Sequence, residues 1–570
     1  MLARILDRLH GFRLPALAWL LSLPVLGLGF QADDHVYRLA RVRGAPAWQM
    51  FTLTLEEAAE QREQGWWVWW SSARLRVDFI RPLTSLNHWL EYGLFPSSPW
   101  VMLLINTLLY AGCVALAVAL YRRVLPDART ATLAGLMYAI DDAHAMTEGW
   151  ISGRNTLLAG MFSLAALLVH MEARKRRSWQ LQLAAGVCVA LALGSSEAGL
   201  WSFALLFAYA LALDEGSWHE RTRSLLPAAC VTAAWAVYYV ASGPHGVPGA
   251  SYYREVSRPL SALGQGLLDL PVWTMSVFGP SIAMTLLTLP AAVSRLIGLT
   301  LSIPPLTWLL PTLPSSRPAR FFATASLLCL LPVLFTVPQD RTAFGATFGG
   351  FGWMACFIGQ VTADSSLFRR FGRGYLLLGH VYLMLLVMLS AERTFEPIEN
   401  AVQLLAAEMK PVRQVVLLNE PVEVIHNYAI NVRSLPPYGE RPGSTHALYA
   451  GSSPLRVTRV DDRTLDIHVE RGWGSSAFER TFCAPEEMPR TGEERRARGL
   501  HVKVLASNAA GMPERVRFQF DTPLEDPERI WLRWQPGGPA NWQPPAVGQS
   551  DNFPALNLFA AVPWGPRKRD

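Results

Sequence analysis

Long runs of apolar residues, separated by short polar segments, fill the chain up to residue 391. A membrane-spanning helix needs about 17 to 25 mostly apolar residues. We therefore predict about eleven transmembrane helices, at approximately 13–30, 99–120, 129–143, 155–172, 179–194, 198–213, 224–241, 281–313, 319–337, 343–362 and 374–391. The stretch 281–313 follows an amphipathic segment from about 263. It contains several prolines and Arg295, so it could hide a re-entrant piece.

The pattern changes after residue 391. Residues 392–410 read as an amphipathic connecting helix. From residue 411 on, short runs such as 455–460 and 465–469 alternate apolar with polar residues, which predicts β-strands. The predicted fold is therefore an α-helical polytopic membrane domain over 1–391, followed by a small β-rich extracytoplasmic domain over 411–570. We expect an irregular tail from about 535, where proline and glycine are frequent.

Positive charge marks one side of the predicted membrane domain. Arginine clusters fall at alternate loops: Arg4, Arg8 and Arg13, then 122–123, 174–177, 221–223, 317–320 and 369–373. Loops on the cytoplasmic side of a membrane carry an excess of Arg and Lys. We therefore expect a cytoplasmic N-terminus and a C-terminal domain outside. Almost all of the positive charge is arginine, which indicates a GC-rich bacterial genome, so we expect the bacterial inner membrane. No small-x-small cleavage site follows the first apolar segment, so we expect a retained helix.

Composition narrows the class of protein. The chain has 570 residues, of which 51% are hydrophobic and 17% charged, with mean hydropathy +0.19. These values exclude an ordinary soluble protein of this size. The net charge of +6 sits mainly at span ends, so we expect the lipid bilayer and not nucleic acid as the partner. Five of six cysteines lie in apolar segments, and no disulfide framework or CxxC metal site is visible.

The first outer loop, 31–98, is long and contains the run Trp66-Trp67-Val68-Trp69-Trp70. Tryptophan favours the membrane interface, so we expect interfacial helices along the outer leaflet. Simple anchoring is one interpretation of the run. The other is that it lines a groove for a lipid tail.

Polar residues gather at the outer ends of the predicted spans. Asp33, Asp34 and His35 follow the first span, and a carboxylate pair costs little at a water-filled interface. The remaining candidates for substrate binding are Arg81, Glu91, Asp142, His144, Glu148, Arg154, Glu197 and Arg341. Such carboxylates can deprotonate a hydroxyl, and arginine forks match phosphate oxygens. The set suits a donor that carries a sugar and a phosphate on a lipid.

Each group also has a structural interpretation. Asp33 and Asp34 can simply end a span, Asp141-Asp142 can be solvated loop residues, and Arg154 can anchor a helix at the headgroups. His144 and Glu148 stand four residues apart, so on a helix they share a face. That pair can bind a divalent metal or form a plain hydrogen bond. We predict no certain cofactor.

Several motifs together resemble a known family. They are "RPLTSLNHWLEYGLF" (81–95), "NTLLYA" (106–111), "AGLMYAIDDAHAMTEGWISGRNTLLAGMFSLAALL" (134–168) and "LALGSSEAGLWSFALLFAYAL" (191–211). With the acidic pair after the first span, they resemble the multi-span C-type (GT-C) glycosyltransferases, most of all protein O-mannosyltransferase-like proteins and tetratricopeptide-bearing transmembrane O-mannosyltransferases. The resemblance covers roughly 10–365.

The resemblance implies a membrane enzyme that uses a polyprenyl-phosphate-linked sugar donor on the outer face. It implies Asp33 or Asp34 as the base, inversion at the anomeric carbon, and a protein or glycan acceptor. Three features depart from the family: Ser196 replaces a lysine before Glu197, Asp141-Asp142 replaces His-Pro, and the β-rich domain replaces the repeats. The alternatives are a transporter or flippase of a lipid-linked or anionic substrate, and a catalytically inactive membrane scaffold.

Overall fold

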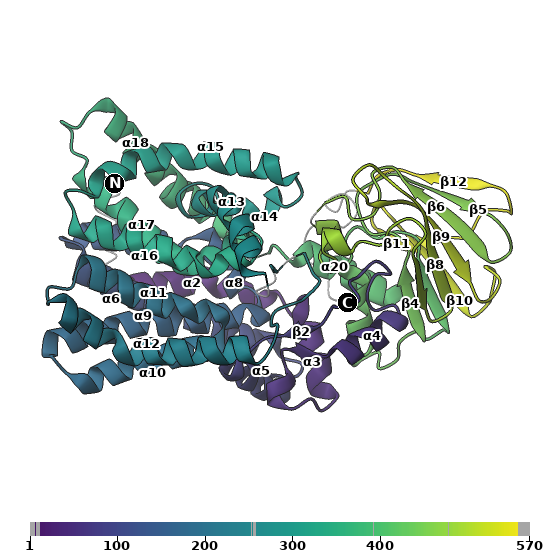
Figure 1. Ribbon diagram of the computed structural model, residues 1–570, viewed down its shortest axis with the longest axis horizontal. Helices are drawn as coiled ribbons and strands as arrows, with labels where there is room; N and C mark the ends of the chain where they lie inside the picture. The colour runs from purple at the N-terminus through teal and green to yellow at the C-terminus, as the bar shows by residue number, and fades with distance from the viewer. Residues whose placement is uncertain are drawn as a thin grey trace. The chain divides into compact units, whose positions relative to one another are not determined.

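The computed structural model describes residues 6, 12–251, 253–254, 258–391, 393–476 and 478–556 (Figure 1). Its chain divides into two compact units. Unit 1 comprises Met1–Phe30, Phe79–His245 and Glu255–Thr394, and unit 2 comprises Gln31–Asp78, Gly246–Arg254 and Phe395–Asp570. The expected division placed all of 31–98 with the membrane domain, whereas 31–78 folds with the C-terminal region.

Unit 1 is helical and has an apolar core. Its elements are α2 (Arg13–Ser22), η1 (Leu23–Gly27), α5 (Pro82–Leu94), α6 (Pro99–Val124), α7 (Ala128–Ala139), α8 (Asp142–Glu148), η3 (Ile151–Gly153), α9 (Arg154–Arg176), α10 (Trp179–Ser195), η4 (Glu197–Gly199), α11 (Leu200–Ala212), α12 (Trp218–Ala241), α13 (Pro259–Phe278), α14 (Ala283–Leu286), α15 (Ala291–Leu309), η5 (Leu310–Thr312), α16 (Arg317–Leu330), η6 (Pro332–Phe335), η7 (Asp340–Ala343), α17 (Phe344–Gln360), α18 (Leu367–Leu377), the π-helical η8 (Leu378–Leu383) and α19 (Met384–Ala391). Large side chains such as Trp201, Trp273 and Phe321 are buried among these helices.

Within the described residues, six helical segments are long and apolar enough to cross a membrane. They are Pro99–Val124, Ile151–Arg176, Trp218–Ala241, Ala291–Thr312, Arg317–Phe335 and Leu367–Met388. Shorter apolar helices cover Arg13–Gly27, Trp179–Ser195 and Glu197–Ala212. These segments indicate an integral membrane protein, while the count of eleven spans stays a prediction. Arg4 and Arg8, on which the predicted topology partly rests, lie outside the described residues.

The predicted single span 281–313 is divided. Helix α13 ends before Gly279-Pro280, and α15 begins after Pro290. Only the short α14 lies between them. Proline removes a backbone donor and disfavours helix in the residue before it, so these two positions interrupt the apolar run.

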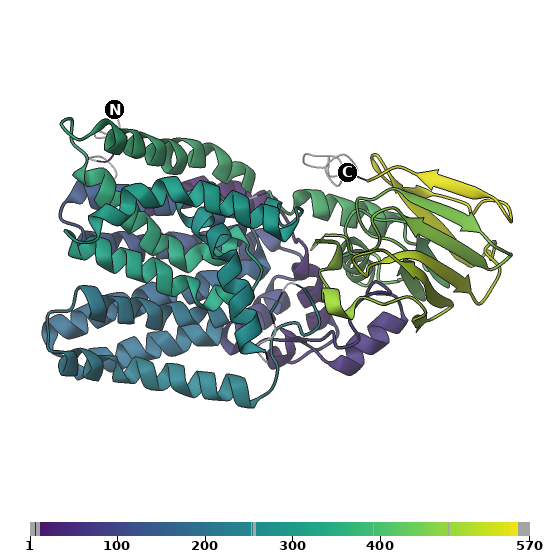
Figure 2. The ribbon, with the colours of Figure 1, turned by 45° about the horizontal axis from the view of Figure 1, so that its top comes forward.

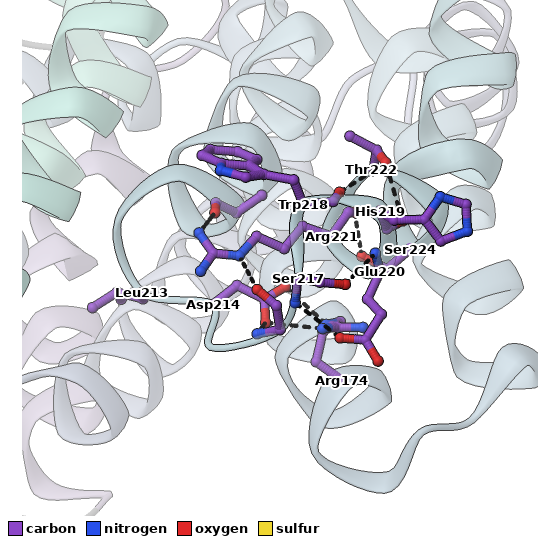
Figure 3. A network of polar contacts seen from close by, with 12 residues as sticks. Arg174, Leu213, Asp214, Ser217, Trp218, His219, Glu220, Arg221, Thr222 and Ser224 are labelled. Carbon is purple, nitrogen blue, oxygen red and sulfur yellow. Dashed lines mark hydrogen bonds and ion pairs between the residues drawn. The ribbon is translucent and has the colours of Figure 1, made fainter.

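Hydrogen bonds and ion pairs connect the C-terminal end of α9 to the segment between α11 and α12 (Figure 3). The Arg174 guanidinium pairs with Asp214, with 2.8 Å between Nε and Oδ2. Ser217 and Glu220 form a capping box at the start of α12. Arg221 donates to the carbonyl of Gly216 at 2.7 Å. Arginines of the predicted basic side are therefore held in local contacts that fix the connection between α11 and α12.

The described residues of unit 2 form three sheets. The strands of the two C-terminal sheets are drawn as green to yellow arrows in Figure 2. Its elements are α3 (Asp33–Val42), η2 (Ala47–Gln49), β1 (Thr52–Leu53), α4 (Leu55–Glu63), β2 (Val77–Asp78), α20 (Glu396–Glu408), β3 (Gln414–Leu417), α21 (Ile425–Arg433), β4 (Ser444–Ala447), β5 (Leu455–Arg459), β6 (Thr464–Val469), η9 (Phe478–Arg480), η10 (Pro485–Glu487), β7 (Glu494–Ala497), β8 (Leu500–Ser507), β9 (Pro513–Phe520), β10 (Arg529–Gln535), β11 (Gly538–Asn541) and β12 (Ser550–Phe553). One sheet pairs β1 with β2, a second has the order β11-β10-β3-β4, and the third has the order β12-β5-β6-β9-β8-β7.

The C-terminal sheet region is confirmed, with two differences from prediction. Strand β3 pairs in parallel with β4 and β10, and α21 connects β3 to β4. This small α/β part was not predicted. Strands β11 and β12 also lie in the tail that we expected to be irregular, while residues 557–570 of that tail are outside the described residues.

The tryptophan run is part of the core of unit 2. Trp70 is fully buried, and Trp69 is 7% exposed. The ring of Trp69 lies 5.8 Å from those of Trp473 and Phe518, and its indole N–H donates to the carbonyl of Leu448 at 3.0 Å. The expectation that this run lies along the outer leaflet is therefore wrong, because these side chains pack against the sheet region.

Unit 2 constrains how the chain crosses a membrane. Its three segments come from positions far apart in the sequence. One folded unit of this kind lies on one side of a membrane, since irregular backbone is not tolerated in lipid. The chain must therefore cross an even number of times between Asp78 and Gly246, and again between Arg254 and Phe395. If α16, α17 and the α18–α19 segment all cross, then α13 and α15 cannot both do so.

Candidate functional site

Arg154 holds a buried polar cluster at the N-terminal end of α9. Its side chain is fully buried and forms an ion pair with Glu91 of α5. It also donates to Asn106 at 2.6 Å, to Asn87 at 2.8 Å and to the carbonyl of Met102 at 2.6 Å. These contacts join α5, α6 and α9. They account for the side chain structurally, so its predicted role in substrate binding stays a prediction.

Asn106 extends this cluster toward α8. Its amide nitrogen donates to the carbonyl of Glu148 at 3.0 Å and to that of Trp150 at 2.9 Å. The Glu148 side chain is fully buried. Sequence reasoning missed Asn106, although a polar residue inside the apolar run 99–120 is itself a signal for a functional or structural site.

Arg81 and Glu197 form a second ion pair at the same helix ends. The Arg81 Nε and Nη2 atoms lie 2.9 and 2.8 Å from Oε2 of Glu197. The side chains are 11% and 24% exposed, so this pair is more open than Arg154–Glu91. Burial, together with the nearby charges of Arg154 and Arg81, lowers the pKa of His88 well below its usual value. His88 is therefore neutral in the folded protein.

Acidic residues gather where α7 ends and η7 begins. Asp141 and Asp142 are both buried. Asp340 accepts from Ser276 at 2.9 Å and from the backbone N–H groups of Ala283 and Met284 at 3.1 Å. Burial raises the pKa of Asp340 even though these hydrogen bonds oppose the shift. Asp340 thus fixes the start of α14 beside the acidic pair.

Arg341 lies next to this acidic group. Its guanidinium carbon stands 5.1 Å from the ring centre of Trp150, and its Nε donates to Gln339 at 2.9 Å. Trp150 therefore connects Arg341 to the cluster around Arg154, because its carbonyl accepts from Asn106. The structure thus brings Arg81, Glu91, Asp142, Glu148, Arg154, Glu197 and Arg341 to the ends of neighbouring helices in unit 1.

His144 is fully buried in α8 and is held by protein groups. Its Nε2 lies 2.8 Å from the Thr347 hydroxyl and 3.3 Å from Oδ2 of Asp141, and its Nδ1 lies 3.0 Å from the Tyr138 carbonyl. Both ring nitrogens thus already have neighbours. Within the described part of the chain, no group of three or more His, Cys, Asp or Glu residues has a geometry that could hold a metal ion.

The acidic pair of the first loop lies in unit 2, at the start of helix α3. Asp33 is half-buried and accepts from the Tyr428 hydroxyl at 2.6 Å. Asp34 is fully buried and accepts from the Gln31 N–H at 2.9 Å. The helix N-terminus stabilises both charges. Of the two, Asp33 is the more exposed.

His35 is also held within unit 2. Its Nε2 lies 3.0 Å from Oε1 of Glu399 on α20. Sequence reasoning identified neither Tyr428 nor Glu399, because both lie more than 360 positions along the chain from their partners. No local signal in the sequence connects them to the first loop.

Comparison with known proteins gives a partial match. No family model matches the chain. The human protein O-mannosyl-transferase TMTC2 is 28% identical over 134 residues, which is 23% of this chain and 16% of that protein. The Xenopus laevis protein O-mannosyl-transferase tmtc2 is 29% identical over 134 residues, with the same coverage. The match thus spans about one sixth of the length of these curated relatives.

Two solved structures share a weaker likeness. ArnT from Cupriavidus metallidurans, bound to undecaprenyl phosphate, has a TM-score of 0.36 at 14% identity over 77% of this chain and 85% of that chain. The Archaeoglobus fulgidus oligosaccharyltransferase, tethered with an acceptor peptide, has a TM-score of 0.36 at 12% identity over 76% and 63%. Neither likeness is strong enough to carry an argument. The match to the O-mannosyl-transferases confirms the resemblance to that group that the sequence motifs predict.

Proposed function

We propose that this chain is a membrane glycosyltransferase. It moves a sugar, by analogy with its relatives a mannose, from a polyprenyl-phosphate carrier to a hydroxyl group of a protein or glycan on the outer face of the inner membrane. The observation that carries the proposal is the buried cluster of arginines and carboxylates at the helix ends of unit 1. Charged groups inside an apolar bundle are expensive and mark functional sites.

Asp33 is the proposed base. Its carboxylate takes the proton from the acceptor hydroxyl, and the resulting oxygen nucleophile attacks the anomeric carbon of the sugar. The bond between that carbon and the phosphate oxygen breaks, and the phosphate leaves with the electron pair. Direct displacement inverts the anomeric carbon. The hydrogen bond from Tyr428 orients the Asp33 carboxylate, and Asp34 supports the helix start.

Arg81 or Arg341 is the proposed partner of the leaving phosphate. Negative charge builds on the phosphate in the transition state, so a fixed cation there lowers the barrier. Arg341 is half-buried above Trp150. Arg81 is aligned by Glu197. Glu91, Asp142, His144, Glu148 and Arg154 would then shape and position the donor site.

The proposed topology puts the N-terminus in the cytoplasm and unit 2 outside. The alternation of arginine clusters with acidic loops supports this orientation. In this orientation the α2 segment crosses the membrane once and places Gln31 outside. The even numbers of crossings after Asp78 and after Arg254 then return the chain to the outside, where all three segments of unit 2 meet. A reporter fused after Asp570 that is active only in the cytoplasm would contradict this orientation.

The test uses the full-length protein in lipid nanodiscs. A polyprenyl-phosphate donor carrying radiolabelled mannose is supplied with a serine- and threonine-rich peptide, and label on the peptide is measured. Asp33→Asn should nearly abolish transfer, and Asp34→Asn should reduce it less. Asp364→Asn, which changes an exposed acid between α17 and α18, is the matched control.

Three outcomes decide the proposal. Loss of transfer in Asp33→Asn with normal transfer in Asp364→Asn supports it. Normal transfer in an Asp33→Asn/Asp34→Asn double variant removes the catalytic role of the pair. In sealed vesicles, movement of intact donor across the bilayer without transfer would favour the transporter alternative.

A further inference from the structure

Two arginines lie over the ring of one buried tryptophan in unit 2. The guanidinium carbon of Arg43 lies 5.4 Å from the ring centre of Trp66, and that of Arg441 lies 5.0 Å from it. Trp66 is only 3% exposed, so the two cations and the surrounding chain cover its ring. Arg43 follows α3, whereas Arg441 precedes β4, so the fold joins two distant segments here.

Arg498 completes this group, which we call the arginine cluster. It adjoins β8, and its charge, like that of Arg43, lowers the pKa of the Arg441 guanidinium in addition to the larger effect of burial. Arg43 and Arg498 are exposed at the surface, and Arg441 is half-buried. Because these like charges act on Arg441 and repel one another, their grouping is unfavourable without a nearby anion.

The arginine cluster lacks a matching set of acceptors. In the described residues, none of the three arginines forms an ion pair with a carboxylate within 4.0 Å. Glu60 is the one acid whose charge acts on both Arg43 and Arg441, and it already accepts from Gln64 at 3.0 Å. The buried indole N–H of Trp66 also has no acceptor in this part of the chain. The site is rich in donors and suits a multivalent anion such as a phosphate group.

Exposed apolar side chains stand close to Arg43 in the sequence. Val42 is 60% exposed, and Trp48 is 75% exposed. Between them the chain turns at Gly44, whose φ of +82° favours glycine. Aromatic and aliphatic side chains beside basic residues are typical of segments that enter the headgroup region of a bilayer.

The covalent chain limits how far Arg43 can lie from the first apolar helix. Five residues separate the end of η1 at Gly27 from the start of α3 at Asp33, which allows at most about 18 Å. The ten residues of α3 add about 15 Å before Arg43. The chain length therefore allows Arg43 to reach lipid headgroups beside the first apolar helix.

We propose that the arginine cluster binds the phosphate groups of anionic lipids in the adjacent leaflet, while Val42 and Trp48 enter the headgroup region. Unit 2 would then be docked on the bilayer by this surface in addition to its covalent connections. The inference concerns lipid binding alone and does not depend on sugar transfer.

The test measures backbone hydrogen exchange of residues 40–52 in the full-length protein. The protein is placed in nanodiscs of phosphatidylcholine alone or of phosphatidylcholine mixed with phosphatidylglycerol. Because each basic residue near an anionic surface contributes appreciably to binding, we expect exchange to be slower by about tenfold or more in the anionic nanodiscs. High salt should remove the difference, since it screens the attraction.

Variants identify the groups responsible. The triple variant Arg43→Gln, Arg441→Gln, Arg498→Gln should exchange at the same rate in both kinds of nanodisc. The control variant Arg456→Gln, Arg463→Gln, Arg515→Gln removes equal charge from strands β5 and β9 and the β5–β6 turn, and should keep the wild-type difference. An unchanged melting temperature shows that the triple variant folds.

Three results would overturn the proposal. Exchange in wild type that is equal in the two kinds of nanodisc excludes docking on anionic lipid. Equal loss of protection in the control variant assigns the effect to net charge and not to this site. Protection by inorganic phosphate in neutral nanodiscs, as strong as that by phosphatidylglycerol, shows that the site takes free phosphate and not a lipid headgroup. Loss of mannosyl transfer has no bearing on any of these results.

Discussion

The ion pair between Arg154 and Glu91 should contribute strongly to the stability of unit 1. The two side chains are 0% and 7% exposed, so neither charge is well solvated once its partner is removed. Removing one partner of a buried pair costs about 3–5 kcal/mol of folding free energy. Arg154→Met also leaves the acceptors on Asn106, Asn87 and Met102 without their donor. We therefore expect the single variant to reach at least the upper part of this range.

A double-mutant cycle isolates the pair. Glu91→Gln alone leaves the Arg154 charge buried without a compensating carboxylate, so it should also cost several kcal/mol, about 3–5. The double variant Arg154→Met/Glu91→Gln removes both charges and should lose less than the sum of the singles. We expect a coupling energy of about 1–3 kcal/mol. Thermal unfolding in detergent, followed by tryptophan fluorescence, gives the comparison.

The same helix offers a matched control. Arg176 and Glu172 on α9 form an ion pair with 2.5 Å between Nε and Oε1, but the Arg176 side chain is 68% exposed. A cycle on this pair should give a far smaller coupling energy, because water and salt screen the two exposed charges. Equal coupling in the two cycles would refute the structural role of Arg154. Normal stability of Arg154→Met with loss of transfer would assign it to the substrate instead.

The remaining predictions concern both units. Trp70→Ala should destabilise unit 2 by about 3–5 kcal/mol, because the side chain is fully buried. A small effect on thermal unfolding would contradict this and favour the interpretation that the tryptophan run lies at the membrane interface. Burial raises the pKa of Glu423 to about 8. The folded state therefore keeps a proton that the unfolded state releases near its usual pKa, so stability is highest below that value and declines as the pH rises toward 8, by at most about 5 kcal/mol. In Glu423→Gln the melting temperature should depend less on pH across this range. If the pH dependence is the same as in wild type, Glu423 is ionised in the folded protein. Arg341→Ala should lower kcat for transfer, because it raises the activation free energy by about 2–4 kcal/mol. Arg341→Lys should recover part of the activity. Full activity in both variants would leave Arg81 as the proposed phosphate ligand.

The sequence indicated most helices because length and hydropathy are local properties. Helices α6, α9 and α10 lie within a few residues of their predicted ranges. Contacts between distant residues could not be predicted in this way. Arg81 and Glu197, for example, are 116 positions apart in the chain.

Hydrophobicity alone also fails to identify the partner of an apolar segment. The side chains of Trp69 and Trp70 are equally suited to a lipid interface and to a protein core, and only the fold shows that they pack against the β-rich region. Strands β3 and β4 are buried at every position, so they lack the alternation that distinguishes an exposed strand. Their parallel pairing through α21 was therefore missed.

The three-part construction of unit 2 has a consequence for biosynthesis. The tryptophans at 66–70 leave the ribosome long before their partners Trp473 and Phe518, which follow about 400 positions later. At typical elongation rates of about 5–20 residues per second, this interval lasts roughly 20–80 s. During that time an aromatic segment is outside the bilayer core without its native cover. A chain interrupted before Phe395 would keep that surface exposed, so quality control of this protein should recognise truncated chains through their first loop.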